Sequence, residues 1–146
     1  MDYMRLAIKE AEKAALRDEV PIGAVLVHKD GEILAAAGNR CETLKDPTAH
    51  AEMLVIREGA EKLGDVRLPE CDLYVTLEPC PMCATAISFA RIRRLYFGAY
   101  DPKGGGVDHG PKIYTQSTCH HAPDVYSGIE EQACVDLLRK FFIDKR

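Results

Sequence analysis

The sequence LYVTLEPCPMC occupies residues 73–83 and joins two kinds of local pattern. Residues 73–77 are apolar, aromatic or β-branched, which predicts a buried strand. Pro79 and Pro81 end that strand, and Pro81 suits the first turn of a helix, which we expect over residues 82–91. The stretch therefore predicts a strand that passes almost directly into a helix.

The segments on either side predict further helices and strands. Three of them have the apolar spacing of helices: residues 2–17, 49–62 and 129–142. Three short apolar segments are predicted strands: residues 21–27, 32–36 and 94–99. We expect Asp2 and Thr48 to begin the first two helices, Gly64 to end the second, and residues 38–47 and 101–125 to form loops. This order predicts a mixed sheet between helices, which is an α/β class.

The composition is that of one ordinary domain spanning residues 1–146. Hydrophobic residues make up 47% and charged residues 29% of the chain, which excludes a disordered protein. The net charge of −4 argues against a protein that coats nucleic acid through bulk positive charge, although a local basic patch stays open. No apolar run approaches the roughly 18 residues of a membrane span, and no secretion signal is visible. We therefore expect a cytoplasmic protein that does not bind membranes.

Six cysteines are the unusual feature of the composition. Disulfides would suit a small secreted chain, but this chain has enough apolar residues for a full core. Free or metal-bound thiols are the better prediction. Cys80 and Cys83 have the spacing Cys-x-x-Cys, and the other four cysteines have no such partner.

Three short pieces carry candidate chemistry, and each lies at the start of a predicted helix: His50-Ala51-Glu52, Glu78-Pro79-Cys80 and Cys80-Pro81-Met82-Cys83. Helix N-termini favour negative charge, which suits thiolates beside a metal. Two thiolates and one imidazole give three protein ligands, which leaves the fourth tetrahedral position of a zinc ion open for water. Glu52 is then a candidate proton carrier, provided that the end of the helix lets it face the same site as His50.

The spacing His-x-Glu followed by Pro-Cys-x-x-Cys resembles the signature of the zinc deaminases of nucleobases. Within these deaminases, the sequence resembles one family most. Residues 19–25, 46–52, 73–83 and 137–142 look like the bacterial tRNA adenosine deaminase family, and the similarity runs through nearly the whole chain.

This resemblance implies a three-layer α/β/α cytidine-deaminase-like fold, with a central mixed sheet of about five strands, in a homodimer. It implies conversion of adenosine to inosine at the wobble position of a tRNA anticodon. The zinc ligands of the family, which holds one zinc ion per subunit, match His50, Cys80 and Cys83, and its acid/base matches Glu52. The family's substrate-binding positions match five further residues: Ile22, Asn39, Ala51, Asp101 and Phe142.

The expected chemistry is hydrolytic. Zinc lowers the pKa of a bound water to about 7. Glu52 would take the proton of that water and pass it to N1 of adenine and then to the departing amino group. Phosphate contacts are expected from cations near the cysteine helix, in the long loop and at the C-terminus: Arg91, Arg93, Arg94, Lys103, Lys112, Arg139, Lys140, Lys145 and Arg146.

Two other functions stay open at this stage. A deaminase of free nucleobases or nucleosides would share the zinc site entirely, although the basic last helix and Asn39 favour tRNA. A zinc domain without turnover would be expected to have four ligands and no need of Glu52. Ammonia release from a panel of bases, set beside inosine formation in an anticodon stem-loop, discriminates these functions.

Residues 102–121 leave two open motifs. Three consecutive glycines, Gly104 to Gly106, predict a flexible segment in which substrate choice can vary. Cys119-His120-His121 invites a second metal site, but no further ligand pair lies nearby in sequence. Histidines that pack against the last helix are the simpler interpretation.

Overall fold

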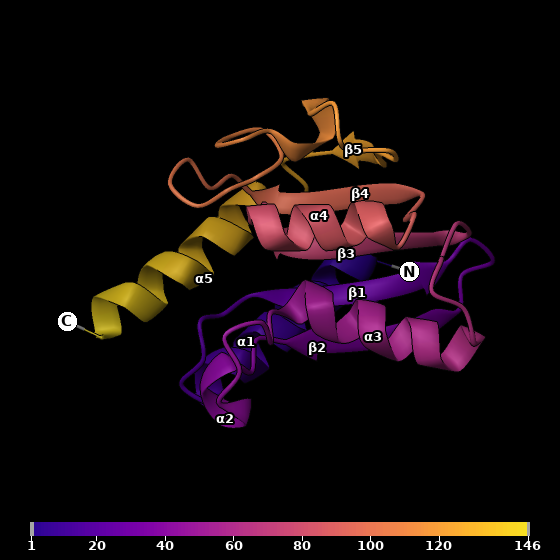
Figure 1. The fold of residues 1–146 in the computed structure, drawn as a ribbon. Helices are drawn as coiled ribbons and strands as arrows, with labels where there is room; N and C mark the ends of the chain where they lie inside the picture. Colours follow the sequence, from indigo (N-terminus) through magenta and orange to yellow (C-terminus); the bar gives the residue numbers. More distant parts are fainter. Residues whose placement is uncertain (1, 146) are drawn as a thin grey trace.

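A five-stranded mixed sheet with the order β2-β1-β3-β4-β5 forms the centre of the molecule, in a computed structural model that describes residues 2–145 (Figure 1). Strand β1 (Gly23–His28) pairs antiparallel with β2 (Ile33–Gly38) and with β3 (Cys71–Leu77). Strands β4 (Arg94–Ala99) and β5 (Asp124–Tyr126) continue the sheet in parallel with β3. The parallel half brings the carboxyl ends of β3 and β4 to one edge, where ligand sites of α/β sheets form.

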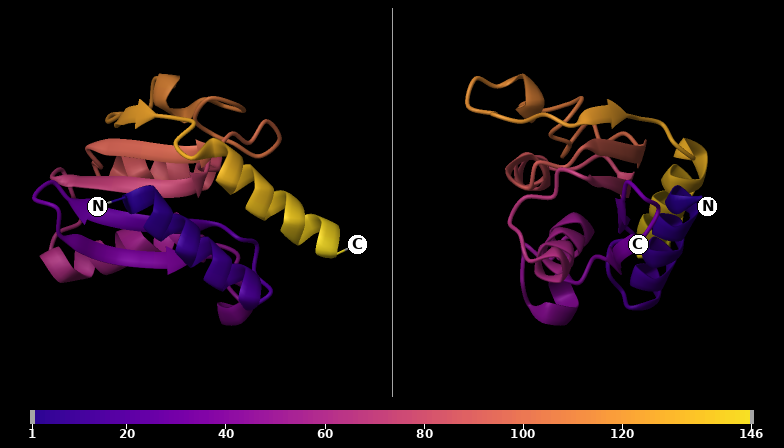
Figure 2. Two further views of the ribbon diagram at one scale, coloured as in Figure 1. Left: turned by 180° about the vertical axis from the view of Figure 1, so that it is seen from behind. Right: turned by 90° about the vertical axis from the view of Figure 1, so that its right-hand side faces the viewer.

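Helices cover both faces of this sheet. Helices α1 (Tyr3–Leu16) and α5 (Glu131–Asp144) lie together on one face, and α3 (Ala51–Leu63) and α4 (Pro81–Phe89) lie on the other (Figure 2). The predicted three-layer α/β/α fold is confirmed.

Strand β1 contributes side chains to the hydrophobic core on both faces of the sheet. Its side chains alternate between the two faces, so Ala24 and Leu26 join the core under α3 and α4, whereas Val25 and Val27 join the core under α1. All four are buried, which explains why the strand reads as a continuous apolar run.

The helix boundaries follow local chemistry, with one correction. Asp2 caps α1 by accepting the Arg5 N–H at 3.1 Å, and Gly64 ends α3 in the left-handed region at φ 66°, both as expected. Thr48 does not begin α3; the N-cap is His50. The Thr48 side chain instead donates to Asp46 Oδ1, which closes a turn before the helix.

Both predicted loops contain short regular elements that the sequence analysis missed. Helix α2 (Cys41–Leu44) lies in the first loop, and the 3₁₀ turn η1 (Ile113–Thr115) and strand β5 lie in the second. Elements of three or four residues carry too few positions for a periodic pattern.

The structure bears on two features of the chain, its membrane-spanning capacity and the state of its cysteines. None of the helices in residues 2–145 combines the length and the apolar character that a membrane span requires. All six cysteines are free of disulfides.

Candidate active site

The three predicted metal ligands meet where α3 and α4 begin. His50 and Cys80 are the N-cap residues of the two helices, and Cys83 lies in the first turn of α4. His50 Nδ1 lies 3.6 Å from Cys80 Sγ and 3.5 Å from Cys83 Sγ. All three donor atoms lie within 4.8 Å of one another.

These separations fit a zinc ion. Zinc–sulfur and zinc–nitrogen bonds of ordinary length at tetrahedral angles place nitrogen and sulfur about 3.6 Å apart. In residues 2–145, this is the one group of three or more His, Cys, Asp or Glu side chains with the geometry to hold a metal ion. Three protein donors leave one tetrahedral position for a ligand from outside the chain.

The electrostatics of the donors agree with this assignment. A hydrogen bond between the two thiols lowers the pKa of Cys80 to about 4 and raises the pKa of Cys83. The hydrogen bond between Cys80 and His50 raises the pKa of the imidazole. A thiolate beside a thiol is a donor set that a divalent cation completes by displacing the remaining proton.

Glu52 faces the same site because the chain turns at His50. His50 has extended backbone angles, φ −72° and ψ 151°, so it is not yet part of the helix in which Glu52 lies. The Glu52 side chain therefore reaches Cys83. Within a regular helix, His50 and Glu52 would lie on different faces, because they are two residues apart. Glu52 is 4% exposed, and burial raises the pKa of its carboxyl to about 7. A carboxyl in this environment is suited to exchange protons near neutral pH.

Asn39 ties three elements together beside the metal donors. Its Oδ1 accepts the Ala51 N–H at 2.8 Å, and its own N–H donates to the Ile22 carbonyl at 3.1 Å. Asn39 is 7% exposed. Because Oδ1 is engaged by the chain, the amide nitrogen is the part of this side chain that remains for a substrate.

A pocket of about 560 Å³ brings together three of the predicted substrate residues: Ile22, Asp101 and Phe142. It opens between the start of β1, the segment after β4 and the end of α5. The remaining lining residues are mostly apolar: Val20, Leu77, Tyr100, Lys103 and Leu138. The structure thus divides the predicted substrate residues into two groups, with Asn39 and Ala51 at the start of α3 and the other three around this pocket.

Two buried glutamates, Glu19 and Glu78, lie in segments that the sequence singled out, but the sequence assigned neither of them a specific role. Glu19 accepts the N–H groups of Glu42 and Thr43 and the Thr43 hydroxyl, at 2.7 to 3.1 Å, and so holds α2 near Asn39. Glu78 accepts several N–H groups of the segment after β4. Local sequence could not predict what either carboxylate holds, since their partners lie more than 20 residues away in the chain.

The structure separates the predicted phosphate-binding cations. Arg91, Arg93 and Arg94 precede or begin β4, at the opposite end of that strand from Asp101, and they do not flank the metal donors. Arg93 also pairs with Asp72 through two hydrogen bonds of 2.9 and 2.7 Å. Arg93 is therefore engaged by a carboxylate in this structure, and phosphate contacts from Arg91 and Arg94 stay a prediction.

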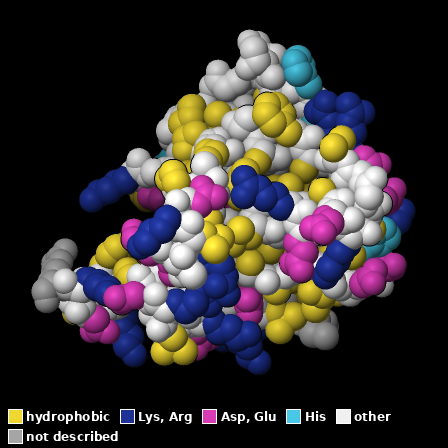
Figure 3. Space-filling model, turned by 60° about the horizontal axis from the view of Figure 1, so that its bottom comes forward, with side chains coloured by type: hydrophobic (Ala, Val, Ile, Leu, Met, Phe, Trp, Pro, Cys, Tyr) yellow, Lys and Arg dark blue, Asp and Glu magenta, His cyan; other side chains and the backbone are white. Residues whose placement is uncertain are grey.

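The remaining cations lie in the loops and on the last helix. Lys103 lines the pocket, and Lys140 lies on α5. Lys145 pairs with Asp18, and Arg146 lies outside the described residues. Figure 3 shows one face of the molecule, on which Lys and Arg side chains stand between acidic and hydrophobic ones. On this face the cations are thus interspersed with other side chains and do not form a uniform basic surface.

Cys119-His120-His121 neither forms a second metal site within residues 2–145 nor packs against the last helix. His121 Nε2 lies 2.8 Å from the Ile92 carbonyl, and its own carbonyl accepts the Ser88 hydroxyl at 2.6 Å. Cys119 Sγ lies 3.5 Å from the same hydroxyl. The segment packs against the end of α4, and η1 also contacts that helix.

Comparisons with known proteins agree with this site. The family described as the cytidine and deoxycytidylate deaminase zinc-binding region matches residues 1–99, which include all three metal donors and Glu52. A tRNA-specific adenosine deaminase of Agrobacterium fabrum is 62% identical over 144 residues, covering 99% of this chain and 94% of that protein. A tRNA-specific adenosine deaminase of Bacillus subtilis is 49% identical and covers 99% and 89%.

A solved structure from a study of A-to-I editing by tRNA:A34 deaminases superposes with a TM-score of 0.91. It is 62% identical, and the match covers 93% of this chain and 98% of that one. The chain therefore belongs to the tRNA-specific adenosine deaminase family, within the zinc-binding deaminases of the cytidine and deoxycytidylate type.

Proposed function

We propose that this chain is a hydrolase that converts adenosine to inosine at position 34 of a tRNA anticodon, with one zinc ion bound to each subunit. The observation that carries the proposal is the buried carboxyl of Glu52 beside three metal donors that leave one position open. The relatives named as tRNA-specific adenosine deaminases supply the substrate.

The chain's own part in the reaction is to move protons. A zinc ion held by His50, Cys80 and Cys83 would act as a Lewis acid toward the water molecule in its open position. Glu52 accepts a proton from that water and delivers it to N1 of adenine, which makes C6 more electrophilic. The oxygen of that water adds to C6 as N1 is protonated. Glu52 then takes the remaining proton of the new C6 hydroxyl group and delivers it to the amino group, so that the C6–N bond breaks, ammonia leaves and the C6 carbonyl of inosine forms.

Substrate recognition is divided between the two groups of residues. Asn39 and Ala51 hold the target base and its sugar next to the metal donors, and Ile22 forms an apolar wall of the base site at the edge of the pocket. Asp101 and Phe142 take the neighbouring nucleotides in the pocket of about 560 Å³. A base in such a site must leave its stack, and an anticodon loop lowers that cost because its bases are already weakly stacked.

The negative net charge is compatible with an RNA substrate because an anticodon loop is short. Lys103, Arg139 and Lys140 are the proposed phosphate contacts, since they lie in the pocket wall or on α5. Each alanine substitution among them is expected to reduce the slope of log affinity against log salt by about 1. An unchanged slope in all three variants would contradict the assignment.

The proposed assembly is a homodimer in the cytoplasm. Helix α4 is apolar along most of its length, yet it is not buried all round. Phe89 is 74% exposed, and Met82 and Ala86 are half-buried on the same helix. We expect a second copy to cover this face, so that Phe89→Glu gives a monomer in sedimentation where the parent chain gives a dimer.

Nucleoside analysis of tRNA incubated with the purified protein tests the function. Inosine at anticodon position 34 is the expected product, and a chelator should abolish its formation until zinc is restored. Ammonia release from free guanine, cytosine or adenosine without any inosine in tRNA would favour the alternative, a deaminase of free bases or nucleosides.

A further inference from the structure

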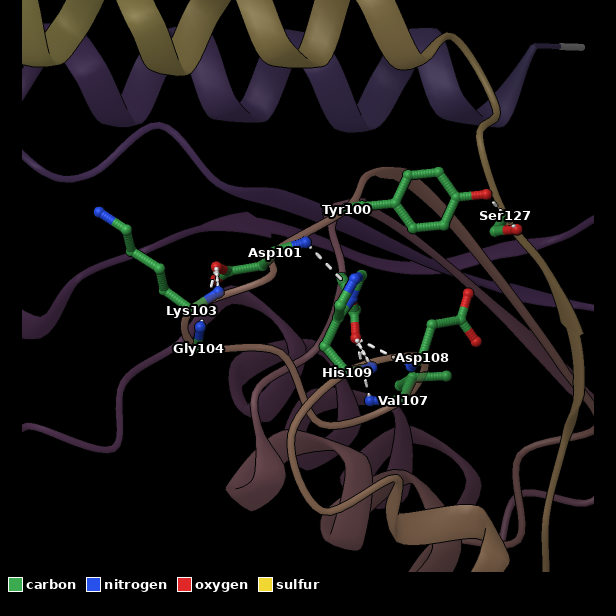
Figure 4. A network of polar contacts seen from close by, with 9 residues as sticks. Tyr100, Asp101, Lys103, Gly104, Val107, Asp108, His109 and Ser127 are labelled. Carbon is green, nitrogen blue, oxygen red and sulfur yellow. Dashed lines mark hydrogen bonds and ion pairs between the residues drawn. The ribbon is translucent and has the colours of Figure 1, made fainter.

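Glu78 is a fully buried carboxylate with no Lys or Arg partner among residues 2–145. It lies between the end of β3 and Cys80. Oxygen Oε2 accepts the N–H groups of Val107, Asp108 and His109 at 3.2, 2.9 and 3.1 Å. Oxygen Oε1 accepts the Asp101 N–H at 3.0 Å and lies 2.8 Å from His109 Nδ1. Figure 4 shows Asp101, Val107, Asp108 and His109 gathered in this network of hydrogen bonds.

The hydrogen bonds explain why this carboxyl stays ionised without a cation. Burial opposes ionisation, but the hydrogen bonds from Asp101, the His109 side chain and the backbone N–H groups of Val107 and Asp108 outweigh it and lower the pKa of Glu78. A carboxylate that accepts several N–H groups fixes the backbone that donates them. The segment 101–109 is therefore wrapped around one side chain.

Two of the three consecutive glycines, Gly105 and Gly106, allow this wrapping; the flexibility of the segment stays a prediction. A Cβ at Gly105 would overlap Glu78 Oε2 and lie 2.6 Å from the Asp101 carbonyl oxygen. A Cβ at Gly106 would lie 2.6 Å from the backbone nitrogen of Pro81. The Gly106 N–H also donates to the Pro79 carbonyl at 2.8 Å, which seats the segment against the metal-binding stretch. Gly105 and Gly106 are therefore needed because other backbone atoms approach them too closely for a Cβ.

Asp101 connects the Glu78 anchor, which we define as the Glu78 carboxylate with the N–H groups it accepts, to the pocket. Its N–H is held by Glu78, and its Oδ1 accepts the N–H groups of Lys103 and Gly104 at 3.2 and 2.9 Å. Asp101 and Lys103 both line the pocket that also contains Phe142. The position of this pocket wall thus depends on a carboxylate that does not itself line the pocket.

We propose that Glu78 is a positioning residue for substrate recognition, which sets Asp101 and the pocket wall for the nucleotides beside the target adenosine. The proposal rests on the proposed function, since it assigns that pocket to the neighbouring nucleotides. Glu78 acts through Asp101 and has no part in proton transfer. Its loss should therefore weaken RNA binding far more than it slows the chemical step.

Glu78→Gln tests this selectively. A glutamine keeps one oxygen, which is best placed at the Oε2 position, where it still accepts three N–H groups. Its NH₂ group then faces the Asp101 N–H at the Oε1 position, and two donors cannot pair. The variant should release Asp101 while residues 107–109 stay anchored. Glu70→Gln is the matched control, because Glu70 precedes the other end of β3 and its side chain is half exposed in an ion pair with Lys29.

The experiment measures kcat and KM on an anticodon stem-loop, zinc content, and amide hydrogen exchange of residues 101–109. For Glu78→Gln we expect a KM raised about tenfold or more, consistent with the loss of one charge-assisted hydrogen bond, and a kcat within about threefold of the parent. Zinc content should be unchanged, and exchange should rise at residue 101 more than at 107–109. Glu70→Gln should leave all four quantities unchanged.

Three outcomes overturn the proposal. A kcat loss with unchanged KM would place Glu78 in the chemical step, and faster exchange at residue 101 with unchanged KM would show that the anchor does not serve binding. A parent chain that forms no inosine in any stem-loop would overturn the proposed function and the role of Glu78 with it, whereas its exchange pattern would still report the anchor. If Glu78→Gln does not fold, Glu78→Asp, which keeps the charge but shortens the reach, is expected to raise KM in the same way.

Discussion

Glu52 and Glu78 are both buried carboxyls within two residues of a metal donor, yet their surroundings act in opposite directions. Burial raises the pKa of Glu52 to about 7, because few donors stabilise its charge. For Glu78 the same burial is outweighed by hydrogen bonds from the segment 101–109, and the pKa falls. The number of donors around each carboxyl thus decides which of them has a pKa near neutral pH.

The difference separates two functions that a short sequence motif places side by side. Glu52 is suited to carry protons because its charged and neutral forms are close in free energy near neutral pH. Glu78 is suited to hold backbone because its charged form is strongly favoured. We therefore expect replacement of Glu52 to lower turnover, and truncation of Glu78 to lower the free energy of unfolding.

The largest expected effect is on turnover. Glu52→Gln should lower kcat by about a thousandfold, within the range that general acid–base catalysis contributes, because glutamine cannot accept the proton of water. Zinc content and melting temperature should stay close to those of the parent chain, since the amide matches the carboxyl in size. Deamination at the parental rate would show that Glu52 carries no proton.

The second effect is on stability. Glu78→Ala leaves five donors of the segment 101–109 without an acceptor, which should cost about 3–5 kcal/mol. For a chain of this size, the melting temperature would fall by roughly 10–15 °C in calorimetry. Glu52→Ala is the matched comparison, with an expected change of less than about 1 kcal/mol, since few hydrogen bonds are lost. Equal losses of unfolding free energy in Glu78→Ala and Glu52→Ala would contradict the difference in hydrogen bonding between the two carboxyls.

The third effect tests how tightly the anchored segment is seated. Gly106→Ala places a Cβ against the backbone of Pro81 and should cost about 1–3 kcal/mol, because backbone atoms cannot move aside easily. Gly104→Ala is the control, since its Cβ would meet only the Asp101 side chain at 3.1 Å. Thermal melts of the two variants provide the measurement. A Gly106→Ala chain as stable as Gly104→Ala would contradict the close seating.

The smallest effect concerns Glu19, a third buried carboxylate. Burial opposes its ionisation, but hydrogen bonds from Thr43 and Glu42 outweigh it and lower its pKa. Glu19→Gln places an NH₂ group against a donor and should lower the melting temperature by about 3–6 °C at pH 7. A lowered pKa stabilises the fold above the unfolded value of about 4.3, and this contribution is lost as the pH falls through the folded value.

The melting-temperature difference between the parent chain and Glu19→Gln should therefore shrink as the pH is lowered from 7 to below about 4. A difference that stays constant over this range would mean that the ionised carboxylate of Glu19 does not hold α2.

Much of the metal site could be predicted from the sequence because its chemistry is local. His50, Cys80 and Cys83 are ligand types, and each lies where a helix begins, so a few neighbouring residues determine both the donor and its orientation. Asp2, Gly64 and Pro81 mark helix boundaries for the same reason, since caps depend on residues one to four positions away.

The sequence by itself determined the order of the main helices and strands, the α/β class and the metal donors. Only the tertiary structure decided what Glu78 and Glu19 hold, where β5 pairs, and that Arg93 serves Asp72 at the far end of the sheet. These outcomes are hydrogen bonds between residues roughly 20 to 30 positions apart, whose partners depend on the path of the whole chain. A carboxylate looks the same in sequence whether it finds five donors or almost none, and that number separates a fixed anchor from a proton carrier.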